Sequence, residues 1–185
     1  MRPQLGKEKI LSAALRLFAT NGFHATSISQ IAEQAGVSKG LTYVYFKSKD
    51  ELLLTIIDQA SEGMFDIANT MSSQTDYLKT LRQFLDQYLL ALNTDKDFLS
   101  FQLSLLLQPE LKPVVQASLQ RRAESLLAIT ETMFRNAGIE RANLTARRFM
   151  TELDGIALHH LSVFKDFPLE EMLEQVFLNY KDLQK

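Results

Sequence analysis

The feature that most constrains the fold is the stretch from residue 26 to residue 49, which reads TSISQIAEQAGVSKGLTYVYFKSK. It holds two short segments of helical apolar period separated by Gly36, and a third segment follows at once. Ser27 with Gln30 is a capping box for the first segment, and Ser38 can cap the second. Two short helices joined by a tight turn form a helix-turn-helix, which fits a groove of duplex DNA.

The second helix of this stretch carries residue types that suit DNA. Gly40 would let the backbone come close to the duplex, and Leu41 could contact a thymine methyl group. Tyrosine hydroxyls, lysine ammonium groups and helix-start N–H groups suit phosphate oxygens. The residues predicted to contact DNA are Thr26, Ser27, Ser38, Lys39, Gly40, Leu41, Tyr43, Tyr45 and Lys49. The alternative is a three-helix cap with core aromatics, and we assign Phe46 to that core.

The charge distribution supports a nucleic-acid partner for the amino-terminal region. Residues 1–50 hold seven Lys/Arg and three Asp/Glu, so their net charge is 7 − 3 = +4. The remaining residues hold 13 basic and 19 acidic side chains, which gives 13 − 19 = −6. A basic head on an acidic body indicates that the head meets the polyanion, although counts this small also arise by chance.

The apolar period is helical almost throughout, so the sequence predicts an all-α fold of about nine helices. The first spans 7–21, the helix-turn-helix lies at about 26–46, and a long connector helix spans about 48–71, opened by a Ser48–Glu51 capping box. A loop at 72–76 precedes two helices over 78–92 and 98–107. A seventh helix then ends at residue 136, an eighth spans about 143–164, and a ninth begins at residue 168. We expect a DNA-binding domain at 1–50 and an effector-binding and dimerisation domain at 51–185.

Several classes of protein are disfavoured by what the 185 residues lack. There is no cysteine, no signal-peptide pattern, and no apolar run long enough to span a bilayer, so we expect a cytoplasmic protein without a membrane partner. The adjacent pair His159–His160 cannot present both imidazoles to one metal ion from one helix face. No catalytic or phosphate-loop motif occurs. We therefore expect no enzyme, no metal ion and no cofactor.

The stretch GVSKGLTYVYFKSKDEL at 36–52 resembles the amino-terminal signature of the tetracycline-repressor (TetR) family. The segments at 10–18, 21–23 and 26–32 are similar to the first two helices of that family. The resemblance covers about residues 7–55, with one departure: Leu41-Thr42 stands where the family often has Thr-Leu. It implies a homodimeric, ligand-responsive transcription regulator whose third helix enters the major groove, and it implies the DNA contacts named above.

The body of the chain offers candidates for an effector pocket and a dimer surface. Family members bury a small effector among the fifth to eighth helices and dimerise through the last two. Polar residues on otherwise apolar helices are the ligand candidates: Gln102, Ser104, Gln108, Gln116, Asp154 and His159. The wide apolar sets of the last two helices fit either a dimer interface or a larger monomer core: Phe149, Leu153, Ile156, Leu161, Phe164, Leu169, Leu173, Val176 and Phe177.

The sequence therefore favours a repressor that binds a near-palindromic duplex as a homodimer and is released by a small, lipophilic effector. Two alternatives remain open. One is a helical enzyme or lipophile-binding protein with an accessory DNA-binding head. The other is a regulator controlled by a partner protein.

Overall fold

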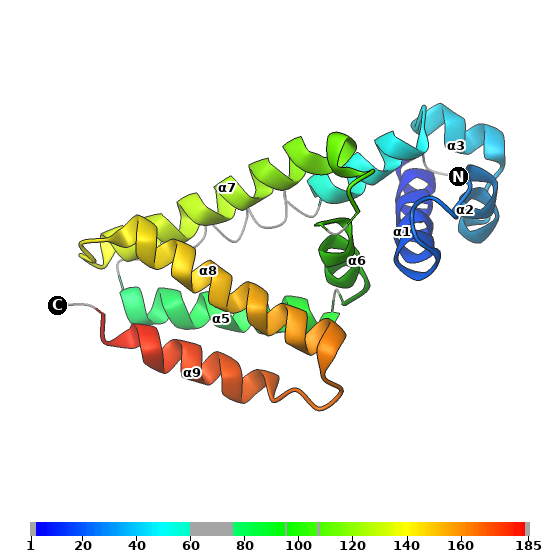
Figure 1. The fold of residues 1–185 in the computed structure, drawn as a ribbon. Helices are drawn as coiled ribbons and strands as arrows, with labels where there is room; N and C mark the ends of the chain where they lie inside the picture. Colours follow the sequence, from blue (N-terminus) through cyan, green and yellow to red (C-terminus); the bar gives the residue numbers. More distant parts are fainter. Residues whose placement is uncertain (1–2, 60–75, 95, 107, 184–185) are drawn as a thin grey trace. The chain divides into compact units, whose positions relative to one another are not determined.

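The computed structural model describes residues 3–59, 76–94, 96–106 and 108–183, and in these ranges it contains helices and turns without any strand (Figure 1). An all-α fold is therefore confirmed. The helices are α1 (Pro3–Asn21), α2 (Ile28–Ala35), α3 (Lys39–Tyr45), α5 (Tyr77–Thr94), α6 (Lys96–Leu106), α7 (Lys112–Asn136), α8 (Ala142–Leu158), the π-helix η1 (His159–Val163) and α9 (Leu169–Lys181). Residues 49–59 are also helical.

The predicted caps and ends of α2 and α3 are confirmed, whereas α1 starts at Pro3 and not at residue 7. The Ser27 Oγ accepts the Gln30 N–H at 3.2 Å, while the Gln30 Oε1 accepts the Ser27 N–H at 2.8 Å. Gly36 ends α2 in the left-handed region with φ +66°, where glycine has no Cβ penalty. Ser38 then caps α3 by accepting the Leu41 N–H. The turn between α2 and α3 is thus held by local bonds at both sides.

The helix at 49–59 begins as predicted, but its cap differs in one bond. The Ser48 Oγ accepts the Glu51 N–H at 3.0 Å, as in a capping box. The Glu51 carboxylate accepts the Lys47 N–H at 2.6 Å, one residue before the position that the box predicts. The rest of the predicted connector, from residue 60 to 71, and most of the 72–76 loop lie outside the described residues.

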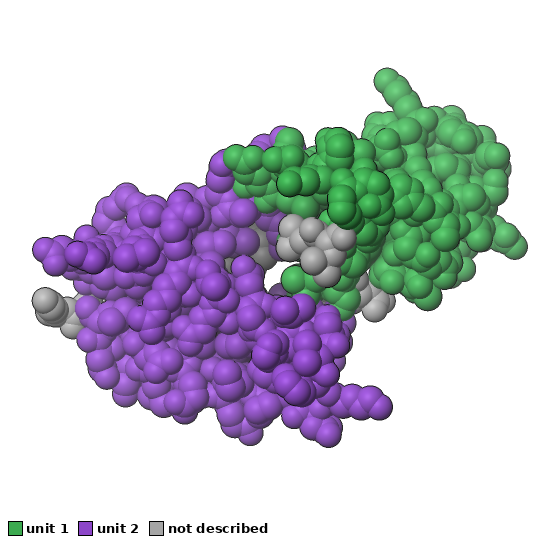
Figure 2. Space-filling view, in the orientation of Figure 1, with its two compact units in different colours: residues 1–61, 97–120 green, residues 62–96, 121–185 purple. Residues whose placement is uncertain are grey.

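The chain divides into two compact units that do not follow a cut at residue 50 (Figure 2). Unit 1 comprises 1–61 and 97–120, and unit 2 comprises 62–96 and 121–185. The difference arises because α6 and the start of α7 bury apolar side chains in the core of the head. Phe101, Leu105, Leu111 and Val115 are each at most 2% exposed within that core.

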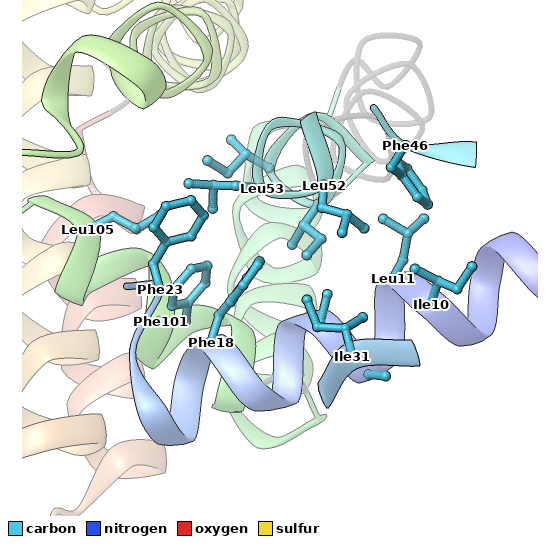
Figure 3. Packing of buried hydrophobic residues seen from close by; sticks show 14 of the residues in the cluster. Ile10, Leu11, Phe18, Phe23, Ile31, Phe46, Leu52, Leu53, Phe101 and Leu105 are labelled. Carbon is cyan, nitrogen blue, oxygen red and sulfur yellow. The ribbon is translucent and has the colours of Figure 1, made fainter. Parts of the chain in front are cut away.

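The core of unit 1 is built from α1, α2, the helix at 49–59 and α6 (Figure 3). Phe18 lies at its centre, with its ring centroid 5.1 Å from that of Phe23 and 5.8 Å from that of Phe101. Phe46, at 1% exposure, follows α3 and lies in the same buried cluster as Leu52, which confirms its assignment to the core. This packing fixes the base on which α2 and α3 stand.

Unit 2 is held by an aromatic cluster between α5, α7, α8 and α9. The Phe149 ring lies 5.0 Å from Tyr180, 5.5 Å from Phe134 and 5.4 Å from Phe84, centroid to centroid. The buried Tyr77 hydroxyl donates to the Tyr180 carbonyl at 2.7 Å, and burial raises the pKa of Tyr77 well above its usual range. α5 and α9 therefore run side by side (Figure 1).

The predicted eighth helix at 143–164 changes type near its end. α8 stops at Leu158, and η1 continues to Val163 with one extra residue in its turn. The Phe164 N–H donates to the His159 carbonyl at 3.0 Å, which is the i to i+5 bond of a π-helix. In the described part of the chain, no helix combines the length and the apolar character that crossing a membrane requires.

Candidate nucleic-acid interface

α3 presents one face to solvent and anchors the other. Thr42 points inward with no exposed surface, while Leu41 and Tyr45 are half-buried. Lys39 and Gly40 are exposed, as is Tyr43 at 48%. The exposed face thus carries a cation, a glycine and a phenol on a short helix. Such a face can enter a major groove while its cation and hydroxyl contact phosphates.

The two serines at the helix starts combine a structural role with exposure. Ser27 and Ser38 are exposed, and each side chain already accepts a backbone N–H of its own helix. The Ser38 hydroxyl keeps donor capacity that suits a phosphate oxygen, whereas the Ser27 hydroxyl donates to Gln30 Oε1 at 2.8 Å in this structure and would have to exchange that bond for a phosphate. Both positions remain predicted contacts.

Thr26 does not present its side chain as the sequence predicts. It is 1% exposed, and its hydroxyl lies 2.8 Å from the Gly22 carbonyl oxygen and 3.2 Å from that of Leu17. The hydroxyl is therefore used to close the end of α1. This corrects the expectation of a phosphate contact through the Thr26 side chain.

Lys49 is likewise used inside unit 1. Its Nζ donates to the carbonyl oxygens of Phe23 at 2.7 Å, Thr26 at 2.8 Å and His24 at 3.3 Å. It also lies 4.5 Å from the centroid of the Phe23 ring, within cation–π range. Burial lowers the pKa of Lys49, and Asp50 opposes that shift. The predicted phosphate contact is corrected to an internal clamp between 49–59 and the loop before α2.

One residue of the exposed face was missed by the sequence reading. Val44 is 76% exposed, more than any other large hydrophobic side chain in the described part of the chain. Val44 stands between Tyr43 and Tyr45 and therefore looks like part of an apolar run in the sequence. Only the orientation of α3 in the folded unit shows that its side chain faces outward. Lys47, two residues after the end of α3, is exposed as well.

The predicted dimer residues divide into two groups in unit 2. Six of them are at most 6% exposed within their own chain: Phe149, Leu153, Ile156, Leu169, Leu173 and Val176. These six belong to the monomer core, so their side chains cannot also form a dimer surface without rearrangement. Leu161 and Phe177 are half-buried, and Phe164 is 53% exposed. Only these three keep surface for a partner.

The predicted ligand residues fall in different units. Gln102, Ser104, Gln108 and Gln116 lie in unit 1, whereas Asp154 and His159 lie in unit 2. Gln116 and His159 are exposed. The Ser104 hydroxyl donates to the Phe101 carbonyl at 2.7 Å. The amide of Gln108 donates to the Ser104 carbonyl at 3.3 Å.

Two polar groups stand out in the interiors of the units. In unit 1, the Gln102 Oε1 is enclosed and has no hydrogen-bond donor. In unit 2, Arg122 is 6% exposed, and burial lowers its pKa. Asp154 keeps access to solvent, yet partial burial of its carboxyl raises the pKa of that group, and the positive charge of Arg122 opposes the shift. The Tyr88 hydroxyl donates to the Leu153 carbonyl at 2.8 Å beside this pair. Among the described residues, no group of three or more acidic or histidine side chains could hold a metal ion.

The head of the chain is similar to a known family of proteins. Residues 10–56 match the family model for bacterial regulatory proteins of the tetR family. The chain is 38% identical over 136 residues to YuxN of Bacillus subtilis, an uncharacterized HTH-type transcriptional regulator, covering 66% of this chain and 45% of that protein. It is 41% identical over 51 residues to the fatty acid metabolism regulator protein of the same organism, covering 28% and 26%. The matches thus span less than half the length of these relatives.

Solved structures share the fold over nearly the whole chain. The fatty acid degradation regulator FadR of Bacillus halodurans aligns with a TM-score of 0.78 at 19% identity, covering 96% of this chain and 94% of that one. FadR of Bacillus subtilis in complex with stearoyl-CoA aligns with 0.75 at 19%, covering 96% and 97%. A TetR transcription regulator of Haloarcula marismortui aligns with 0.78 at 21%, covering 97% and 96%. The head of the chain, at residues 10–56, therefore belongs to the tetR family of bacterial regulatory proteins, and the chain as a whole shares the fold of these solved structures.

Proposed function

We propose that the chain is a sequence-specific DNA-binding transcription regulator, a repressor that a small effector releases from its operator. The observation that carries the proposal is the exposed face of α3, which stands on a helix-turn-helix with intact caps and a buried base. The net charge of +4 on residues 1–50 adds attraction to phosphates. Because an operator lies on the chromosome, we expect such a protein in the cytoplasm.

The DNA contacts that we propose are a reduced version of the predicted set. They are Ser27, Ser38, Lys39, Gly40, Leu41, Tyr43 and Tyr45. Thr26 and Lys49 leave the set because their polar atoms are bonded within unit 1. We add Lys47 to the set as a phosphate contact, because it is exposed and follows the end of α3 by two residues.

The effector is proposed to be a lipophile with an anionic group, and a long-chain acyl-CoA is the first compound to test. One solved structure of the same fold, FadR of Bacillus subtilis, is a complex with stearoyl-CoA. A relative of the head is named as a fatty acid metabolism regulator. Within unit 2, the almost fully buried Arg122 supplies positive charge in a largely apolar interior, and such a cation suits a carboxylate or phosphate.

A homodimer is proposed to form through the surface of unit 2 that remains apolar. The exposed large apolar side chains of α8, η1, the residue after η1, and α9 are Leu144, Leu158, Val163, Phe164, Met172 and Leu178, with exposures from 37% to 59%. Apolar surface of this extent on consecutive elements marks interfaces. A two-fold dimer would read a near-palindromic operator.

Fragment enrichment tests this function. Sheared genomic DNA is incubated with the purified 185-residue chain at moderate salt, and the retained fragments are sequenced. We expect an inverted repeat to be enriched and stearoyl-CoA to release it in a mobility-shift assay. If no fragment is enriched over random DNA, the regulator proposal fails. If a fragment is enriched but stearoyl-CoA and other acyl-CoAs do not release it, the effector class is wrong while the DNA-binding function stands.

A further inference from the structure

Resting on the proposed function, we propose that Gly40 and Val44 form an apolar notch on α3 that receives the C5-methyl group of one thymine in each half-site. The two residues stand four apart in the helix, so they lie on the same face about 6 Å along its axis. Both are exposed. The notch would read sequence, whereas the cations around it would read only phosphate.

The glycine at position 40 has no explanation inside the chain. A Cβ built there would meet only the Ser38 Oγ, at 3.9 Å, and Gly40 does not have a positive φ. Glycine is disfavoured in helices relative to alanine. A small residue that neither the backbone nor the packing requires is accounted for by something outside the chain that comes close, such as a base edge.

Val44 supplies the wall of the notch. Helical side chains lean toward the amino terminus of their helix, so Val44 leans toward the turn that contains Gly40. No side-chain atom of Val44 lies within 4 Å of a Cβ built at Gly40, so open space remains between them. The valine is 76% exposed and contributes nothing to the core.

The occupant of this notch follows from its chemistry. Two apolar carbons and a bare Cα offer no hydrogen bond, so the notch cannot read the donors or acceptors of a base. The thymine methyl group is the one apolar feature of the major groove, and apolar side chains contact it. The exposed Lys39 begins α3 and the exposed Lys47 follows it by two residues, so both cations suit the adjacent phosphates.

A double-mutant cycle with modified DNA tests the notch. The operator is first selected from random duplexes by the 185-residue chain, and each thymine is then replaced singly by deoxyuridine, which removes only the methyl group. We expect one thymine per half-site at which the loss weakens binding about fourfold, the effect of burying one methyl-sized group. In Val44→Ala the same replacement should have almost no effect, and Val44→Ile should retain it.

Gly40→Ala should change the stability of the protein and its affinity for DNA in opposite directions. The variant should keep or raise the melting temperature, because alanine favours the helix, yet bind the operator roughly 5- to 100-fold more weakly because the notch is filled. Leu78→Ala, an exposed apolar truncation on α5, should match the parent protein in both measurements.

The outcomes separate the notch from the proposed function. If no duplex is enriched, the regulator proposal itself fails. If a duplex is enriched but no thymine responds to deoxyuridine, or if the response is equal in the parent and Val44→Ala, the notch is wrong. A Gly40→Ala protein with parental affinity would overturn it as well.

Discussion

Replacing Lys49 with methionine separates an internal clamp from a phosphate contact. Methionine keeps much of the length of the side chain but removes the ammonium group that donates to the carbonyls of Phe23, His24 and Thr26. We expect Lys49→Met to weaken operator binding by loosening the loop that carries the start of α2, without removing a phosphate contact.

The magnitude follows from the three bonds. A hydrogen bond to a charged group contributes roughly 1.5–3 kcal/mol, but Lys49 is half-buried, so water can replace part of what is lost. For the whole group of bonds we expect a loss of about 2 kcal/mol in the free energy of unfolding of the chain. At roughly 2–4 °C per kcal/mol for a chain of this size, the melting temperature should fall by about 4–8 °C.

The assay combines thermal unfolding with the salt dependence of operator affinity. Each phosphate contact contributes about 0.9 to the slope of log K against log salt concentration. Lys49→Met should leave that slope unchanged and lower the melting temperature. The matched control, Lys47→Met, should lower the slope and leave the melting temperature unchanged, because Lys47 is exposed. The clamp is refuted if Lys49→Met reduces the slope and unfolds at the parental temperature.

Three further predictions follow from single groups. Ser27→Ala should cost about 1 kcal/mol of stability by removing the α2 cap, measured by urea unfolding; an unchanged midpoint would contradict the cap. Burial and Lys96 lower the pKa of His160, so its contribution to stability is present above pH ~6.5 and is lost as pH falls through the folded pKa. His160→Gln should therefore flatten the acid side of a melting-temperature profile; a profile equal to that of the parent protein would contradict this. Phe164→Glu should shift the mass measured by analytical ultracentrifugation from dimer to monomer, and an unshifted dimer would move the interface elsewhere.

Much of the head could be predicted because its signals are local. Capping residues such as Ser27 and Ser38 act on N–H groups three positions away, and Gly36 determines its own turn, so sequence spacing is sufficient. The use of Lys49 could not be predicted in the same way. Its partners lie 23 to 26 residues earlier in the chain, and a flexible lysine reads as a surface cation until the fold places carbonyls around it.

The body could be predicted less well because core and interface share one pattern. Leu153 and Phe164 both follow an apolar helical period, yet one is 4% exposed and the other 53%. The period identifies a face but does not say whether the same chain or a second copy covers it. The sequence pattern also does not show that α6 belongs to unit 1, because this depends on a tertiary contact: Phe101 packs against Phe18, which lies 83 residues earlier in the chain.

The ratio of two affinities shows whether α3 reads a DNA sequence. The affinity for the inverted repeat recovered from genomic DNA is measured at physiological salt beside that for a scrambled duplex of the same length and composition. A regulator that reads bases should bind the repeat at least about 10³-fold more tightly. Equal affinities for the two duplexes would contradict the account, because they would show a basic surface that holds phosphates without reading sequence.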